Sequence, residues 1–249
     1  MRNATLLITA ALFLGSAGAV LAANPPAHIA AAVSHQARPQ ADLDRDSTRK
    51  PAEMLTFAGV KPGDTVVDVV PGGGYFTRIF AVAVGPKGKV IAYVPSEIAG
   101  KYNSEANARK LAEAYPNVAV VVDPIASSGA KGVADVVWIS QNYHDIHTPL
   151  LGDPDIAVVN RAIYDVLKPG GVFIVLDHVA EEGSGLRDVN TLHRIDPETV
   201  KAEVTAAGFI YEGESNVLRN KDDKHTANVF DASIRGRTDQ FVYKFKKPR

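Results

Sequence analysis

The chain has 249 residues, a formal net charge of −1 and 46% hydrophobic residues, which is enough to build one sizeable domain. The near-neutral charge balance gives no reason to expect nucleic acid as a partner, because nucleic-acid binding uses strongly basic surfaces. The sequence contains no cysteine, which excludes disulfides, thiolate metal sites and a cysteine nucleophile.

The first 22 residues have the three-part signature of a secretory signal peptide. Arg2 gives the positive start, residues 6–20 are apolar, and Val20-Leu21-Ala22 offers small or apolar residues at a cleavage site. The alternative, an uncleaved membrane anchor, is disfavoured because the apolar run is shorter than the roughly 20 residues of a spanning helix. We therefore expect a signal peptide over 1–22, a periplasmic protein, and no membrane span after removal of the signal.

Residues 23–41 are rich in alanine, proline and glutamine without an amphipathic period, so we expect a flexible leader there. Residues 42–50 are densely charged, which is typical of a solvated segment. Pro51 begins a short helix that Gly59 ends, and residues 61–64 form a turn.

The following stretch combines a strand, a glycine turn and a helix. Thr65 to Val70 is a β-branched run typical of a buried strand, and residues 75–84 are long and apolar enough for a helix. Between them, Gly72, Gly73 and Gly74 allow the backbone to turn sharply and to approach a ligand closely. The N-terminus of the new helix suits a phosphate or a carboxylate. A plain connection without a ligand is the alternative.

Further strands and helices alternate along the rest of the chain, which implies parallel pairing and a doubly wound α/β sheet covered on both faces. We detect no internal repeat and no second core, so a single domain is expected over 42–247. The polar stretch 216–239 is expected to be a long excursion between the last two strands. Strands are predicted over 89–94, 118–122, 134–139, 172–176, 209–212 and 241–245, and helices over 103–115, 154–167 and 197–207.

The glycine turn does not fit the dinucleotide fingerprint, because Thr77 stands where a third glycine is required. Val94 also occupies the end of the second strand, where an acidic residue holds the ribose of NAD. An NAD(P) site is therefore disfavoured.

The stretch instead resembles motif I of the class I S-adenosylmethionine (SAM) methyltransferases, an acidic residue in a strand followed by Gly-x-Gly-x-Gly. Asp68 matches the acid, Gly72 and Gly74 match the last two glycines, and Val70 replaces the first. Together with residues 49–53, 60–64 and 71–77, the chain resembles a group of predicted exported bacterial methyltransferases. The resemblance covers most of residues 45–247.

This resemblance implies a Rossmann-like class I methyltransferase fold with a mostly parallel seven-stranded sheet. Its seventh strand is expected to run antiparallel between the fifth and the sixth, and residues 42–50 are expected either to stay solvated or to lie across the cofactor cleft. SAM is the implied cofactor. The implied cofactor-binding residues at the glycine turn are Asp68, Pro71, Gly72, Gly73, Gly74 and Tyr75, with Asp68 and the glycines holding the methionine part.

Two further acids are candidates for the adenosine part of the cofactor. Glu97 follows the second strand and is the nearest acid that can reach a ribose, although such a residue is more often simply exposed. Asp123 ends the third strand, where class I enzymes often contact the adenine amine. A turn-forming role before Pro124 explains Asp123 equally well.

The fourth strand ends in the most polar cluster of the chain, residues 140–147. By the resemblance, Asn142, Tyr143 and His144 face the site of methyl transfer, and His144 is a candidate general base. A structural loop is one alternative. Another is a metal site built on His144 and His147 with Asp145, for which Asp177 and His178 are further candidate ligands. Because two histidines three residues apart are a weak metal signal, we predict no metal.

The sequence therefore predicts an exported SAM-dependent methyltransferase that acts on an unknown acceptor, a small molecule or a protein. The alternative is a non-catalytic protein of the same fold that binds a nucleoside or a SAM-like ligand. Val70 and Val94 depart from the usual SAM pattern and favour that alternative.

Overall fold

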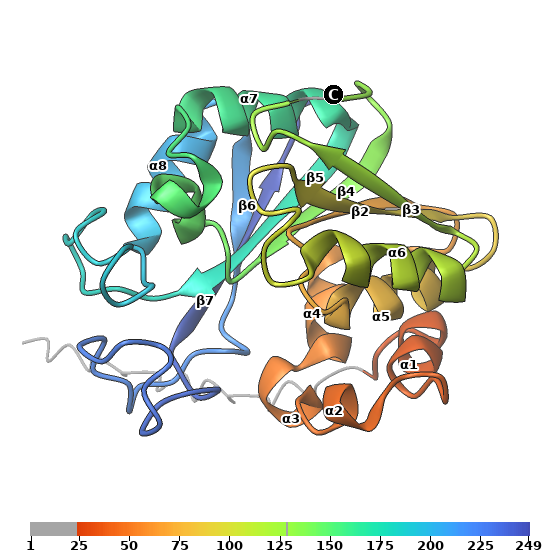
Figure 1. Cartoon of the computed structure of the whole chain (residues 1–249), viewed down its shortest axis with the longest axis horizontal. Coiled ribbons are helices and arrows are strands. Elements are labelled where there is room, and N and C mark those ends of the chain that lie inside the picture. Colours follow the sequence, from red (N-terminus) through yellow and green to blue (C-terminus); the bar gives the residue numbers. More distant parts are fainter. Residues whose placement is uncertain (1–23, 128) are drawn as a thin grey trace, which may run out of the picture.

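The computed structural model describes residues 24–127 and 129–249, so the predicted signal peptide lies outside the described residues. Its strands form one seven-stranded sheet in the order β3-β2-β1-β4-β5-β7-β6 (Figure 1). The strands are β1 (Thr65–Val69), β2 (Lys89–Pro95), β3 (Val118–Asp123), β4 (Ala134–Ser140), β5 (Leu167–His178), β6 (Ile210–Ser215) and β7 (Gln240–Lys246).

Strands β1 to β5 pair in parallel, and β7 pairs antiparallel with both β5 and β6. The expected doubly wound α/β sheet, with its antiparallel seventh strand between the fifth and sixth, is therefore confirmed. In the part of the chain that the structure describes, no helix is long and apolar enough to cross a membrane.

Helices cover both faces of the sheet because its strands are apolar on both sides. Alternate residues of one strand enter different cores: Val66 packs with α4, α5 and α6, whereas Val67 packs with α7 and α8. Figure 1 shows the two helical layers on opposite sides of the sheet. The helices are α1 (Ala27–Val33), α2 (Gln40–Leu43), α3 (Asp46–Arg49), α4 (Pro51–Ala58), α5 (Tyr75–Val84), α6 (Ser104–Ala114), α7 (Ile156–Val166) and α8 (Pro197–Ala206), with short 3₁₀ turns η1 (His144–His147) and η2 (Pro149–Leu151).

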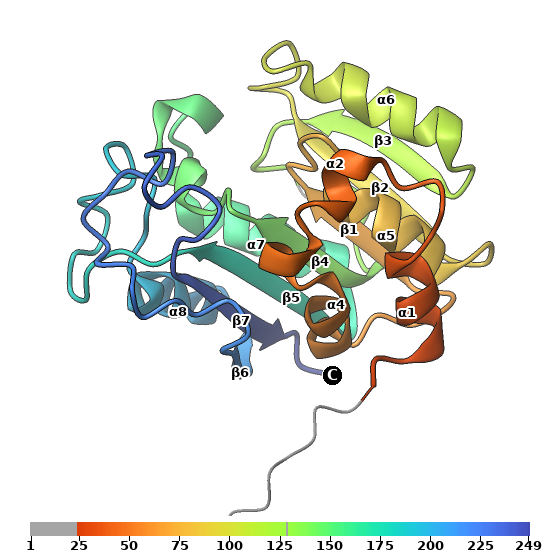
Figure 2. The same ribbon diagram turned by 90° about the horizontal axis from the view of Figure 1, so that it is seen from below.

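The expectation of a flexible leader is wrong for residues 24–41, because α1 packs against α4 and α5 (Figure 2). Ile29 and Ala32 of α1 are buried in the core beneath these helices. His28 Nε2 lies 2.9 Å from the carbonyl oxygen of Val60, which ties the helix to the turn before β1. The helix has only 7 residues, too few for its apolar spacing to be recognised in the sequence.

The helix predicted over 154–167 is shorter than expected, and the strand after it is longer. The Asp155 carboxylate accepts a hydrogen bond from Ala157 N (2.9 Å) and starts α7 at Ile156. At the other end, Leu167 already pairs with Ala134 of β4. The stretch Lys168-Pro169-Gly170-Gly171 therefore lies within β5.

The long excursion between β6 and β7 has no assigned helix or strand over 216–239, as predicted. It is joined to the loop after β5 by a fully buried ion pair, in which Arg194 Nη1 lies 2.9 Å from Asp223 Oδ2. Arg194 also donates to the carbonyl oxygens of Val179 and Ala227. These bonds hold two irregular segments together beside the carboxyl ends of β4 and β5.

Candidate functional site

A cleft of about 610 Å³ opens at the carboxyl ends of β1 and β4. The strand order reverses at this point, since β1 is followed in the chain by β2 on one side and later by β4 on the other. Open α/β sheets bind ligands at such switch points. The cleft is lined by the turn after β1, the charged segment 42–49, the ends of β4 and β5, and the loops that carry His193 and Phe230. Tyr102 and Leu150 add to the lining.

The turn after β1 bends sharply at Val70, the position at which motif I has its first glycine. Val70 has a φ of 55°, a left-handed conformation that costs a β-branched residue free energy. Its backbone N donates to the carbonyl oxygen of Tyr93 (3.0 Å), which keeps the turn against β2. The chain therefore follows the glycine path although a valine stands there.

The glycines of the turn have different roles. Gly72 and Gly73 line the cleft, and a Cβ at either position would meet nothing within 4 Å. Gly74 does not line it, and a Cβ there would overlap the side chain of Leu111 on α6. The lack of a Cβ at Gly74 thus allows α5 and α6 to pack, whereas Gly72 and Gly73 are the open positions. A contact of Gly74 with the cofactor stays a prediction.

Asp68 lies at the floor of the cleft and is 3% exposed. Thr77 Oγ1, from the first turn of α5, donates to Asp68 Oδ2 (2.6 Å). Burial raises the pKa of Asp68 to about 7, although the hydrogen bond from Thr77 and the charge of Arg49 oppose the shift. Asp68 is therefore a buried acid that titrates close to neutral pH.

The charged segment 42–50 lies across the cleft, the second of the two arrangements that the sequence left open. The Tyr75 hydroxyl donates to Asp46 Oδ1 (2.6 Å), and Arg49 Nη2 donates to Gln141 Oε1 at the end of β4 (2.7 Å). Asp46 is in turn held by Arg38, which donates to both carboxylate oxygens. The segment connects the glycine turn with β4 over the top of the cleft.

His144 lies at the other end of the cleft and is paired with Asp177, the next-to-last residue of β5. The Asp177 carboxylate accepts from His144 N (2.8 Å), and its Oδ1 lies 2.9 Å from His144 Nδ1. Burial would lower the pKa of His144, but Asp177, with a contribution from Asp145, raises it above its ordinary value. A carboxylate only accepts, so in the neutral ring Nδ1 carries the proton and Nε2 presents its lone pair.

Asn142 lines the cleft, whereas Tyr143 does not. Asn142 Nδ2 donates to Asp145 Oδ2 (2.9 Å). The expectation that Tyr143 faces the transfer site is wrong, because its buried hydroxyl donates to Glu203 Oε2 (3.0 Å) and accepts from Asn160 Nδ2 (2.9 Å) beneath the floor. The backbone has left the extended conformation of β4 here, since Tyr143 is helical (φ −68°, ψ −40°) and precedes η1, and its side chain lies in the α7–α8 core.

The structure adds two histidines that the sequence analysis did not assign to the transfer site. His193 comes from the loop after β5, and its ring meets that of His144 edge-on, with centroids 5.5 Å apart. His178 ends β5, and its Nδ1 lies 2.7 Å from Thr238 Oγ1. Burial lowers the pKa of His178 to about 4, so this ring is neutral at physiological pH. His193 follows no recognisable pattern in its polar loop.

Glu97 and Asp123 are not among the residues that line the cleft. The Glu97 carboxylate accepts from Ile125 N (3.1 Å), and Asp123 Oδ2 accepts from Ser127 Oγ (2.5 Å). Both acids therefore order the loop between β3 and β4. Their expected contacts with the ribose and the adenine remain predictions.

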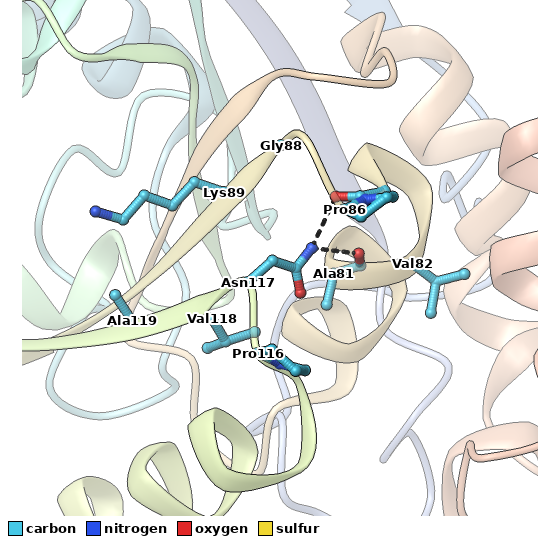
Figure 3. A pocket seen from close by; sticks show the side chains of 10 residues that line it. Ala81, Val82, Pro86, Gly88, Lys89, Pro116, Asn117, Val118 and Ala119 are labelled. Carbon is cyan, nitrogen blue, oxygen red and sulfur yellow. Dashed lines mark hydrogen bonds between the residues drawn. The ribbon is translucent and has the colours of Figure 1, made fainter.

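A second hollow, of about 650 Å³, lies at the opposite edge of the sheet, where β2 and β3 begin (Figure 3). Asn117 Nδ2 donates there to the carbonyl oxygens of Ala81 (2.7 Å) and Gly85 (3.1 Å), so its donors are already used. Among the described residues that line it, Lys89 alone is charged. The hollow lacks the convergent polar groups of the cleft, which is the better candidate for a ligand site.

Comparison with known proteins gives a family match over most of this architecture. A family model described as protein-L-isoaspartate(D-aspartate) O-methyltransferase (PCMT) matches residues 42–211, from the charged segment to β6. Protein-L-isoaspartate O-methyltransferase 1 of Arabidopsis thaliana is 34% identical over 119 residues, which is 47% of this chain and 46% of that protein. A 2-phytyl-1,4-naphtoquinone methyltransferase of Synechococcus elongatus is 32% identical over 126 residues, 49% of each chain. The chain thus spans about half the length of these relatives.

Solved structures share the fold at low sequence identity. A SAM-dependent methyltransferase from Aquifex aeolicus superposes with a TM-score of 0.56 at 19% identity, covering 82% of this chain and 98% of that one. Fibrillarin from Aeropyrum pernix, solved with natively bound SAM, gives a TM-score of 0.52 at 15% identity, covering 81% and 76%.

Proposed function

This chain belongs to the protein-L-isoaspartate(D-aspartate) O-methyltransferase family of SAM-dependent methyltransferases, and we propose that it transfers the methyl group of SAM to an oxygen acceptor. One observation carries the proposal. A single cleft runs from the glycine turn at Gly72 and Gly73 to the lone pair of His144 Nε2. A cofactor bound at the turn and an acceptor bound beside His144 would therefore share one cavity.

We propose that the methionine part of SAM lies against the glycine turn, as the family resemblance implies. The open backbone at Gly73 leaves room for it, and Asp68 supplies a buried carboxyl group near the sulfonium charge. Arg49 and the Tyr75–Asp46 contact lie over the cleft. Holding the two reactants in line supplies much of the acceleration in a displacement of this kind.

His144 is the proposed proton acceptor, as the sequence analysis expected, and Asp177 is the residue that orients it. As the acceptor oxygen attacks the methyl carbon, its O–H proton moves to Nε2. The C–S bond breaks with its electron pair going to sulfur, which leaves S-adenosylhomocysteine and a methylated oxygen. Asp177 keeps the Nδ1–H in place and stabilises the imidazolium that forms.

The family description as an O-methyltransferase supports an oxygen acceptor. The identity of that acceptor is a separate question, since the relatives named for isoaspartate and for a naphthoquinone match over only about half of their lengths. We also propose that the protein is exported, on the strength of the three-part signature of residues 1–22. Loss of about 22 residues, measured by intact mass on periplasmic protein, tests the export.

The proposed chemistry is tested by transfer of labelled methyl from SAM to two oxygen probes, an isoaspartyl peptide and a phenol, in the presence of EDTA. We expect turnover on one of them, and a loss of ~10²–10⁴-fold in His144→Ala with unchanged SAM affinity. SAM affinity is measured by calorimetry. Protein that binds SAM but transfers methyl to neither probe would favour the non-catalytic alternative. Equal turnover in wild type and His144→Ala would show that His144 is not the proton acceptor.

A further inference from the structure

A cluster of potential metal ligands lies at the acceptor end of the cleft. His144, Asp145 and His193 each offer one ligand atom, and these atoms all lie within 4.8 Å of one another. His144 Nε2 and Asp145 Oδ1 are 3.4 Å apart. Atoms bound about 2.1 Å from a first-row metal ion lie about 3.0–3.4 Å apart at octahedral or tetrahedral angles, so this pair already has the required spacing.

The hydrogen bonds around the cluster leave its lone pairs facing one another. Asp177 holds the proton on His144 Nδ1, so in the neutral ring Nε2 is an acceptor directed at a second acceptor, Asp145 Oδ1. Asn142 Nδ2 donates to the other carboxylate oxygen, Oδ2, and leaves Oδ1 free of that bond. Two acceptors at this distance repel each other unless a proton or a metal ion lies between them, so a metal ion would take the place of a proton on Nε2.

The hydrogen bonds that hold His144 and Asp145 in place are of the kind that orients metal ligands. A ligating histidine typically donates its other ring N–H to a carboxylate, as His144 does to Asp177, and ligating carboxylates are themselves hydrogen-bonded, as Asp145 is. Both His144 and Asp145 are less than 10% exposed, so their orientation is fixed by packing.

His193 completes the cluster from a separate segment, in a conformation that the surrounding structure imposes. Its φ is 54°, which is uncommon for a residue other than glycine and is found at functional sites. The adjacent Arg194 is fully buried by its bonds to Asp223 and to two carbonyl oxygens. On the open side, the His193 ring packs against Phe230, with centroids 5.0 Å apart.

We propose that His144, Asp145 and His193 bind one divalent transition-metal ion, of the Zn²⁺ or Mn²⁺ type, which in turn binds the acceptor oxygen. Two imidazole nitrogens and one carboxylate suit such ions better than Mg²⁺, and a three-ligand site leaves positions open for substrate. This departs from our sequence-based prediction of no metal.

The metal gives the acceptor a second route to activation, and this part of the inference rests on the proposed methyl transfer. A metal-bound hydroxyl has a lowered pKa, so it releases its proton to water and the resulting oxyanion attacks the methyl carbon. The C–S electron pair goes to sulfur as before. In the metal-loaded protein, His144 is a ligand through Nε2 and no longer the proton acceptor.

The test is calorimetric titration of EDTA-stripped protein, without the predicted signal peptide, with Zn²⁺. We expect one ion per chain and a loss of affinity of about 10–100-fold or more in both His193→Ala and Asp145→Asn. His35→Ala is the matched control. It removes an exposed histidine that is distant in sequence from the three proposed ligands, and it should bind Zn²⁺ as wild type does. Titration with Co²⁺ gives a second readout, because nitrogen and oxygen ligation changes its visible spectrum.

No stoichiometric Zn²⁺ binding by the wild type, or equal binding by a folded His193→Ala, would overturn the metal site. SAM binding is measured on the same EDTA-stripped protein, so the two proposals fail separately. SAM binding and methyl transfer without metal binding would leave the proposed function intact and remove the metal. Metal binding without SAM binding would leave the metal site intact and contradict the proposed function.

Discussion

Gly73 is the residue at which cofactor access is tested most cleanly. It lines the cleft, a Cβ there meets no protein atom within 4 Å, and its backbone lies outside the left-handed region. Gly73→Val should therefore fold normally while its side chain fills the space for the cofactor. We expect calorimetry to show SAM affinity lowered by about 100-fold or more, equivalent to about 2.7 kcal/mol of binding free energy.

Gly100→Val is the matched control for this substitution, because Gly100 is also open, has no left-handed backbone and does not line the cleft. Wild-type affinity in Gly73→Val would show that the turn is only a structural connection. Gly74→Val is unsuitable for this purpose, since its clash with Leu111 would disturb the packing of α5 on α6.

Asp68 should make folding stability depend on pH in a direction opposite to that of most acids. Its pKa is about 7 in the folded protein and about 3.9 in an unfolded chain, so the folded state binds more protons between these values. The contribution of Asp68 to stability therefore falls as pH rises from about 4 to about 7. Asp68→Asn should remove this component, measured by urea unfolding across that range. Parallel pH profiles for the two proteins would contradict the assignment.

The residue scale is also where sequence reasoning reached its limit. The Gly-Gly-Gly pattern located the cleft, because its function depends on local backbone conformation. The pairing of His144 with Asp177 and its approach to His193 join residues far apart in the chain, and only the tertiary fold brings them together. Tyr143 was misassigned for the same reason, since the neighbours that bury its hydroxyl come from α7 and α8.

At the scale of elements, the N-terminal helices are the part of the fold that closes the cleft. Arg38, whose side chain is fully buried, donates to both oxygens of Asp46, which also accepts from Tyr75. Arg38→Ala would leave the Asp46 carboxylate without its cation. We expect a loss of about 2 kcal/mol in the free energy of unfolding, less than for a fully buried pair because Asp46 is 23% exposed.

Arg109→Ala is the matched control, because Arg109 forms an exposed ion pair with Glu105 one helical turn away. Its removal should cost about 0.5 kcal/mol or less. Urea unfolding measures both variants, and calorimetry should show weaker SAM binding in Arg38→Ala only. Equal stability of the two variants would mean that segment 24–50 is not an integral part of the domain.

The elements themselves were predictable where their pattern is long. The β-branched strand Thr65–Val69 and the ten-residue helix Tyr75–Val84 have clear apolar patterns, and both were predicted within a residue. By contrast, α1 to α3 are 7, 4 and 4 residues long, and their contacts with α5 decide that they form. Ile29 of α1 is buried in the core, Asp42 of α2 pairs with Arg78, and Asp46 of α3 accepts from the Tyr75 hydroxyl. Short helices that depend on tertiary contacts leave little trace in sequence.

At the scale of the whole molecule, the alternation of strands and helices predicted a doubly wound sheet, and the family resemblance supplied the place and direction of its seventh strand. The carboxyl ends of β1 and β4 then locate the cleft by topology alone. Of the segments around this cleft, residues 42–50 were expected there as one of two arrangements. The helix α1 and the loops that carry His193 and Phe230 were not expected, because they lack long regular patterns. Residues 42–50 and these loops converge from both ends of the chain onto the same site.

The most direct test of this account is a crystal structure of the protein with S-adenosylhomocysteine. We predict that the product lies in the cleft, with its amino-acid part against Gly72 and Gly73 and its sulfur directed toward the end that holds His144. Product bound in the hollow of Figure 3, or bound in the cleft with its sulfur directed away from His144, would contradict the proposed methyl transfer.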